Sequence, residues 1–354
     1  MFERNKSLVG IDIGTHSIKL VHLKKSGKNY HLLNFGVMPL KPESIVDGAI
    51  MNAGAVVEGI RSLVRMEKIK TKEVATAISG QSVIVKKIRM PQMTAKELAD
   101  SISWEAEQHI PFEISDVNID FQIMPPPDEG QSVQTNQMDV LLVAAKKTKM
   151  DDYTSLLLEA GLRPVVVDID VFALENEYEI NHEQEGGVVA LVDIGASAMN
   201  INILKHGITM FQRDISCGGN RYNAVLQREF GISYDEAEAL KMGVGFSDGR
   251  GPEQVVPLLV AVSEEIGAEI QRSFEFFRTT TPEVPMNKMV LSGGCARMKG
   301  LDRVLSTRLG LPVEVADPFR NIHYSGKVFD PEYLQEMAPV AAVGVGLALR
   351  RMND

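Results

Sequence analysis

Two stretches of the sequence place a carboxylate directly before a glycine-containing turn. The first, LVGIDIGTHSIKLVHL at 8–23, carries Asp12 and, beyond the turn, Lys19. The second, VALVDIGASAMNINIL at 189–204, carries Asp193, which lies 181 residues after Asp12. β-Rich apolar runs flank Asp-Ile-Gly in both stretches and predict a hairpin in each. A repeat separated by about half the chain predicts two related half-domains.

The chemistry predicted for these turns is the binding of a phosphate chain together with a metal ion. A glycine turn can direct successive backbone amides at one anion. A carboxylate beside such a turn repels phosphate unless a cation lies between them, and Mg²⁺ commonly takes one or two carboxylates and several waters. We therefore expect Asp12 and Asp193 at a Mg²⁺ site. The other residues expected at this clamp are Thr15, Gly195, Ser197 and, as a point charge, Lys19. For either copy alone the alternative is an ordinary turn aspartate; the repeat favours the clamp.

Competing phosphate-binding and hydrolase motifs are missing from the sequence. It has no G-x-x-x-x-G-K-[ST] loop, no G-x-G-x-x-G between a strand and a helix, no H-E-x-x-H and no G-x-S-x-G. His16 lies in the first turn, where an isolated histidine is expected to face solvent. The paired turns therefore remain the main candidate site.

The composition is that of an acidic globular protein. Its 354 residues are 44% hydrophobic and 24% charged, with a net charge of −10. The length predicts two or more domains, and the charge argues against a broad nucleic-acid-binding face. Cys217 and Cys295 fit no disulfide or metal-ligand pattern, which suits a reducing compartment. There is no signal-peptide pattern, and the longest apolar stretch, Met337–Leu349, is too short to span a bilayer. We therefore expect a cytoplasmic protein that reaches a membrane only through a partner.

Hydrophobic periodicity and end signals predict the elements that position the turns. The expected elements are strands at 8–13, 18–23, 30–38, 118–124 and 138–145, two strands within 74–91, helices at about 53–66 and 148–161, a strand and helix within 163–178, and a strand–turn–helix–strand unit within 286–315. Capping boxes predict helices that begin after Thr94 and Ser233. The proline- and glutamine-rich stretch 125–137 is expected to be an exposed loop, and 338–350 a tightly packing helix.

Five segments in this order resemble the signature motifs of the actin/Hsp70/sugar-kinase ATPase superfamily. GIDIGTHSIKL and LVDIGASAMNI resemble the two phosphate motifs, VVDIDVFALE and APVAAVGVGLAL the two connecting motifs, and MVLSGGCARMKGL the adenosine motif. Within the superfamily, essentially the whole chain resembles the PilM family of type IV pilus assembly proteins, relatives of the division protein FtsA. MFERNKSLVGIDIGTHSIKLV, MPQMTAKELADSISWEAEQHIPFEISDVNIDFQIM and FGISYDEAEALKMG carry this closer likeness.

The resemblance implies an α/β, actin-like ATPase fold. Two RNase H-like half-domains would hold a nucleotide in the cleft between them, and an FtsA-type subdomain would be inserted in the first half. The implied boundaries are 1–185 for the first half with the insertion at about 80–147, 186–336 for the second half with a smaller subdomain at about 216–286, and 337–354 for a C-terminal helix packing back on the first half. Only RRMND follows the last connecting motif, so no C-terminal membrane-targeting helix is expected.

The resemblance also implies ATP and Mg²⁺ as cofactors. The phosphate contacts would come from Gly14, Thr15, His16, Ser17, Lys19, Gly195, Ala196 and Ser197. Glu238 and Lys241, three residues apart, would embrace the ribose or adenine, although an ordinary surface ion pair is the alternative. Gly218, Gly219, Gly293 and Gly294 would let the backbone close around the nucleoside, or serve only as turns.

The water-orienting acid implied by the resemblance is Asp170, with Asp168 as the second candidate. Many relatives have Glu or Gln at this position, and aspartate is one methylene shorter. Because hydrolysis depends on positioning the attacking water, we expect ATP binding with slow or negligible turnover.

The partners implied by the resemblance belong to the pilus machine. The chain would act in pilus biogenesis and twitching motility as an adaptor at the inner membrane. It would bind the cytoplasmic N-terminal peptide of PilN in a groove between the first core subdomain and the insertion. Other components of the pilus machine would be further partners. The alternative is an FtsA- or actin-like filament former, so self-association stays open. A small-molecule kinase is a third hypothesis, for which no additional catalytic constellation is found.

Overall fold

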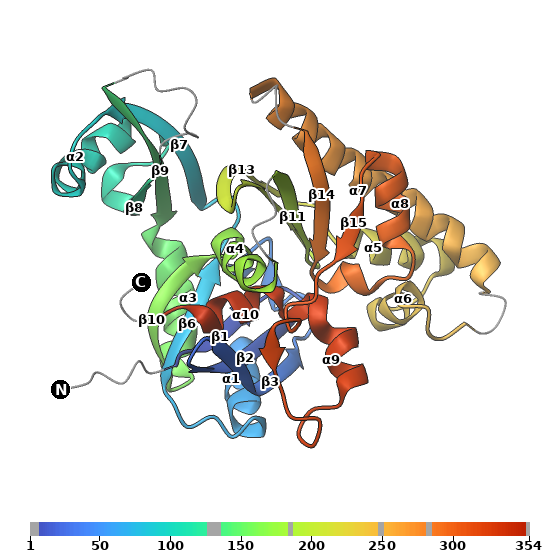
Figure 1. The fold of residues 1–354 in the computed structure, drawn as a ribbon. Coiled ribbons are helices and arrows are strands. Elements are labelled where there is room, and N and C mark those ends of the chain that lie inside the picture. The colour runs from blue at the N-terminus through green and yellow to red at the C-terminus, as the bar shows by residue number, and fades with distance from the viewer. Residues whose placement is uncertain (1–6, 126–135, 183–186, 247–250, 281–284, 352–354) are drawn as a thin grey trace. The chain divides into compact units, whose positions relative to one another are not determined.

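The computed structural model describes residues 7–125, 136–182, 187–246, 251–280 and 285–351 (Figure 1). They form two compact units: a larger one of Met1–Ala77 and Leu156–Asp354, and a smaller one of Ile78–Ser155. Most of the expected loop at 125–137 lies outside the described residues. All the predicted site residues belong to the larger unit.

The first sheet of the larger unit contains the first predicted hairpin. Its six strands run in the order β10-β6-β1-β2-β3-β16. Their bounds are β1 Val9–Ile13, β2 Ser17–Ser26, β3 Asn29–Pro39, β6 Glu73–Ile78, β10 Arg163–Ile169 and β16 Ile322–His323. β1 and β2 pair antiparallel, which confirms the hairpin. Helix α1 (Ala53–Met66) has its predicted bounds and buries Val56, Ile60 and Leu63 beside β2 and β3.

The second sheet contains the second hairpin. Its five strands run in the order β13-β12-β11-β14-β15. Their bounds are β11 Val188–Ile194, β12 Met199–Lys205, β13 Ile208–Ile215, β14 Met286–Ser292 and β15 Val313–Val315. β11 pairs antiparallel with β12, which confirms the second hairpin, and parallel with β14.

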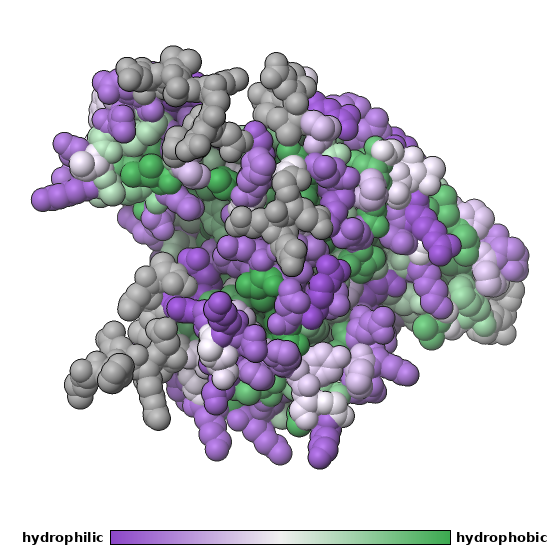
Figure 2. Space-filling model, viewed as in Figure 1, coloured by the Kyte–Doolittle hydropathy of each residue, from purple (hydrophilic) through white to green (hydrophobic). Residues whose placement is uncertain are grey.

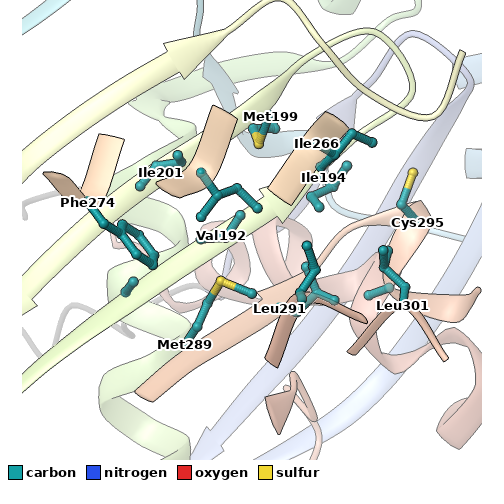
Figure 3. Packing of buried hydrophobic residues seen from close by; sticks show 14 of the residues in the cluster. Val192, Ile194, Met199, Ile201, Ile266, Phe274, Met289, Leu291, Cys295 and Leu301 are labelled. Carbon is teal, nitrogen blue, oxygen red and sulfur yellow. The ribbon is translucent and has the colours of Figure 1, made fainter. Parts of the chain in front are cut away.

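Two helices cover one face of the second sheet, α7 (Pro252–Thr280) and α8 (Leu301–Leu309). Figure 3 shows the resulting core, in which Ile266 and Phe274 of α7 pack with strand residues such as Val192. Helix α7 is absent from the elements expected from the sequence. Pro257 lies inside it, and proline usually ends a helix rather than continuing it.

Two further helices lie between the sheets, α4 (Asp170–Asn181) and α10 (Ala342–Leu349). One hydrophobic cluster joins residues of both helices to strands of both sheets. The helices approach so closely that a Cβ added at Gly346 would lie 1.8 Å from the Ala173 carbonyl oxygen. The small-residue helix expected at 338–350 therefore packs tightly, as predicted.

The remaining elements of the larger unit are short. They are β4 (Ile45–Val46), β5 (Ala49–Ile50), α5 (Asn220–Phe230), α6 (Tyr234–Lys241), the 3₁₀ turn η2 (Gly294–Arg297), α9 (Pro331–Met337) and η3 (Ala338–Ala341). Ser233 and Glu236 form the predicted capping box at the start of α6. This cap fixes where α6, which carries Glu238 and Lys241, begins.

The smaller unit is a three-stranded sheet with a helix on one face. Its strands run in the order β7-β9-β8. The bounds are β7 Val83–Pro91, α2 Ala95–Glu107, η1 Ile114–Asp116, β8 Val117–Ile123 and β9 Gln137–Lys146, and α3 spans Lys147–Glu159. Leu98 and Ile102 of α2 pack against strand residues such as Val140 and Leu142. Thr94 forms the predicted capping box with Glu97.

The face shown in Figure 2 is mostly hydrophilic, with hydrophobic residues exposed in small areas between the polar ones. Among the described residues, no helix combines the length and apolar character needed to cross a bilayer.

Candidate functional site

The two predicted turns have the same backbone geometry. Gly14 N–H donates to the Ser17 carbonyl at 3.1 Å, and Gly195 N–H donates to the Ala198 carbonyl at 2.9 Å. Each partner in the second turn lies 181 residues after its counterpart in the first. The repeat seen in the sequence is therefore also a repeat of hydrogen bonds.

The turns lie side by side, because the side chains of Thr15 and Ser197 meet. Their hydroxyl oxygens are 2.8 Å apart and share a hydrogen bond. This contact joins the ends of the hairpins of the first and second sheets, so residues from the two halves of the sequence share one site.

An ion pair lies at the base of the first turn. Asp12 on β1 faces Lys19 on β2 in the strand register, and the Lys19 Nζ atom lies 3.1 Å from Asp12 Oδ2. Burial alone would lower the pKa of Lys19, but Asp12, Asp193 and Asp170 together raise it above its ordinary value. Lys19 is thus a firmly charged cation with three carboxylates around it.

The second carboxylate, Asp193, lies at the end of β11. Ser292, opposite it on β14, donates its hydroxyl hydrogen to Asp193 Oδ2 at 2.8 Å. Burial raises the pKa of Asp193 to about 6, with a further rise from Asp12, while Ser292 and Lys19 act in the opposite direction. The prediction that Asp12 and Asp193 come together agrees with this geometry.

The two candidate acids lie where β10 leads into α4 and face different surroundings. Asp170 lies near enough to Lys19 to raise its pKa. Asp168 is buried and lies 3.2 Å from the Arg350 guanidinium, and its Oδ1 accepts the Ile169 amide hydrogen. The structure therefore groups Asp170 with the charged cluster and places Asp168 in a separate ion pair.

The Gly218–Gly219 segment packs against the backbone of the second turn. Gly219 N–H donates to the Gly195 carbonyl at 2.9 Å, and Asn220 N–H donates to the Ala196 carbonyl at 2.7 Å. A Cβ at Gly218 would lie 2.6 Å from the Gly195 carbonyl oxygen, so this approach requires glycine.

The second glycine pair lies at the end of β14. Gly293 has φ of 87°, and a Cβ there would lie 2.5 Å from the Ile194 carbonyl oxygen. Gly294 then begins η2, and a Cβ added to it would meet no atom within 4 Å. Gly293 is therefore needed for the turn itself, whereas the space beside Gly294 is open.

The predicted ion pair on α6 is present. The Lys241 Nζ atom lies 2.5 Å from Glu238 Oε2, and Lys241 is only 6% exposed. A Cβ at Gly219 would come within 3.2 Å of the same Nζ atom. Because Lys241 is buried and lies beside the Gly218–Gly219 segment, the pair is not an ordinary surface pair.

His16 does not face solvent as expected; it is half-buried and contacts α6. Its Nδ1 lies 3.4 Å from the Tyr234 hydroxyl, which donates a hydrogen bond to the Asn220 side chain at 2.9 Å. Burial is the main cause that lowers the pKa of His16. The histidine therefore links the first turn to the α5–α6 region.

The arrangement gathers a charged lysine and three carboxylates, those of Asp12, Asp193 and Asp170, around the ends of two hairpins. Among the residues that the structure describes, no three His, Cys, Asp or Glu side chains are grouped as metal ligands.

Comparison with known proteins decides the family. The family described as type IV pilus assembly protein PilM matches residues 10–352. This chain belongs to the PilM family. The solved structure of a PilM–PilN type IV pilus biogenesis complex is similar to it, with a TM-score of 0.84, 30% identity and coverage of 98% of this chain and 99% of the other. Members of the PilM family are type IV pilus assembly proteins, and this chain is one of them.

More distant relatives show the fold. FtsA of Bacillus subtilis (strain 168) is 21% identical over 388 residues, covering 97% of this chain and 83% of FtsA. The structure of MreB5 of Spiroplasma citri bound to AMPPNP has a TM-score of 0.53 and 12% identity, covering 97% and 95% of the two chains. The PilM-family chain therefore has the actin-like ATPase fold that its motifs predicted.

Several residues at the site of this PilM-family chain were missed by the sequence interpretation. They are Asn220, Asn223, Tyr234, Ser292 and Cys295, whose Sγ donates to the Gly195 carbonyl at 3.7 Å. Ser292 directly precedes the Gly-Gly pair, so the adenosine motif could have suggested it. Tyr234 lies within the stretch FGISYDEAEALKMG, but only the packing of α5 against α6 shows that it and Asn223 face the site.

Proposed function

We propose that this PilM-family chain binds Mg-ATP between its two repeated hairpins. The observation that carries the proposal is the meeting of the two turns at Thr15 and Ser197, with Asp12, Lys19 and Asp193 beside them. The AMPPNP-bound MreB5 structure supports it, because a protein of the same fold binds an ATP analogue.

The proposed roles follow the geometry of the turns. Asp12 and Asp193 would hold Mg²⁺ through water, and Lys19 would offer a positive charge to the phosphates. The amides of both turns would cradle the phosphates. Bound Mg²⁺ would neutralise phosphate charge that these carboxylates otherwise repel.

The nucleoside would lie on the α5–α6 side of the site. Glu238 and Lys241 are held together beside Gly219, and the space beside Gly294 is open. This arrangement supports the expectation that both glycine segments and the α6 pair surround the ribose and base. The repeat of the two hairpins also supports the proposed first half at 1–185 and second half at 186–336.

We propose slow or negligible ATP hydrolysis. Asp170 is the remaining candidate for orienting water, since Asp168 pairs with Arg350. Its short side chain would hold an attacking water less closely than Glu or Gln.

We further propose that the chain acts in pilus biogenesis and twitching motility by binding the cytoplasmic N-terminal peptide of PilN. The likeness to the solved PilM–PilN complex, at 30% identity over 98% of this chain, supports this partner. Peptide binding of this kind would place the chain at the cytoplasmic face of the inner membrane through its partner.

Two titrations test the proposal. Calorimetry with Mg-ATP should show saturable binding, weakened when Mg²⁺ is chelated. A labelled PilN N-terminal peptide should bind the full chain saturably, whereas a scrambled peptide should not. Absence of saturable ATP binding by the folded protein would remove the nucleotide role, and absence of peptide binding would remove the adaptor role.

A further inference from the structure

Asn223, on helix α5, is a buried polar residue beside the proposed nucleoside position. The residue is 1% exposed, and its Nδ2 donates to Glu238 Oε2 at 2.7 Å. We propose that Asn223 is a positioning residue, which holds the Glu238 carboxylate so that its second oxygen can accept a hydrogen bond from a ribose hydroxyl. This inference rests on the proposed nucleotide binding.

The two donors around Glu238 converge on the same oxygen. Lys241 Nζ and Asn223 Nδ2 lie 2.5 and 2.7 Å from Oε2. Oε1 has no hydrogen-bond donor among the described residues, and the carboxylate side chain is 22% exposed. Two donors on one oxygen fix the plane of the carboxylate and leave Oε1 as an oriented acceptor.

The same contacts keep Glu238 ionised. Burial alone would raise its pKa, but the charge of Lys241 and the hydrogen bonds from Lys241 and Asn223 bring the pKa below its usual value. A charged acceptor forms stronger hydrogen bonds with hydroxyl donors than a neutral one. The vicinal hydroxyls of a ribose are donors of the kind that Oε1 suits.

Asn223 donates a hydrogen bond to Glu238, but its own side-chain oxygen receives none. Its Oδ1 is buried and has no hydrogen-bond partner in the part of the chain that the structure describes. A buried amide oxygen without a donor destabilises a fold, and a leucine, whose side chain has the same branching and number of heavy atoms, removes that cost in exchange for the lost hydrogen bond to Glu238. The amide is therefore better explained by its hold on Glu238 than by the packing of α5.

The first test compares affinities for ATP and its deoxy analogues by calorimetry. Asn223→Leu should bind ATP about tenfold more weakly than the wild-type chain, while its unfolding midpoint stays the same or rises. The ratio of the affinity for ATP to that for 2′-deoxy-ATP or 3′-deoxy-ATP should be above one in the wild-type chain and fall towards one in Asn223→Leu. Glu229→Ala, an exposed change on the same helix, is the matched control and should leave all affinities unchanged.

A double-mutant cycle tests whether Asn223 acts through Glu238. In a Glu238→Ala background, the further change Asn223→Leu should cost less than twofold in ATP affinity. Independent, multiplying losses would contradict the positioning role.

A third variant, Asn223→Asp, gives a pH signature that a packing defect does not. It places two carboxylates side by side, so one must take a proton. Its ATP affinity should fall as pH rises from 6 to 8, whereas that of Asn223→Leu should not. If the wild-type chain binds no ATP, the proposed function fails; if it binds ATP and the Asn223 variants match it, only this inference fails.

Discussion

Replacement of Glu177 by glutamine should stabilise the protein above neutral pH. Glu177 lies on α4 and is 3% exposed. Its Oε1 accepts a hydrogen bond from Asn181 Nδ2 at 3.0 Å, and the same amide donates to the Pro318 carbonyl. Glutamine keeps the shape and the acceptor of a protonated glutamate, so the contacts with Asn181 should survive.

The reason lies in the protonation of Glu177. Burial raises its pKa from an ordinary 4.5 to about 8, and Asp317 adds to the rise. The folded protein therefore binds a proton that the unfolded chain has released above pH 4.5. The stability contributed by this proton is fully present below pH 4.5 and is lost as pH rises through about 8.

The size of the effect follows from the shift. At about 1.4 kcal/mol for each unit of pKa, the wild-type chain should lose about 3 kcal/mol of unfolding free energy between pH 5 and pH 7.5 through Glu177 alone. Glu177→Gln removes this loss. Urea unfolding followed by far-UV circular dichroism at both pH values measures it.

Glu179→Gln is the matched control, because Glu179 is exposed on the same helix. It should show the same pH dependence of unfolding as the wild-type chain. If Glu177→Gln also keeps the wild-type pH dependence, Glu177 is not held neutral in the folded protein and the reasoning about its burial is wrong.

Three further changes probe the site and its supports. Lys19→Ala should weaken Mg-ATP binding about tenfold in calorimetry while the far-UV spectrum is kept; unchanged affinity would contradict its phosphate role. Ser233→Ala should lower the unfolding free energy by about 1 kcal/mol in urea titration, since α6 loses its capping box; no change would show that the cap is not needed. Gly346→Ala should cost at least about 3 kcal/mol, because its Cβ would overlap the Ala173 carbonyl, and a stable variant would refute this close packing.

Local signals predicted the hairpins and helix starts well. In each hairpin, around Asp12 and around Asp193, a glycine turn joins two adjacent strands. The capping boxes at Thr94 and Ser233 each involve residues only three positions apart. These features depend only on residues close together in the chain, so a single sequence is enough to predict them. Motif resemblance then supplied the order of the halves and the family.

The sequence alone could not supply features that depend on packing between distant segments. Helix α7 continues through Pro257 because its apolar face is buried against the second sheet. His16 meets Tyr234 across more than 200 residues of chain, and Asn223 meets Glu238 only because α5 packs on α6. No local pattern encodes these distances.

The close crossing of α4 and α10 has a mechanical consequence. At Gly346 the helices meet backbone to backbone, and a Cβ added at Gly10 of β1 would lie 2.4 Å from the Gly344 carbonyl oxygen of α10. The nearest atoms at both points are backbone atoms, which cannot change rotamer and so absorb little displacement. A shift of one sheet must therefore pass to the helices as a whole, so the pair should transmit motion between the sheets stiffly.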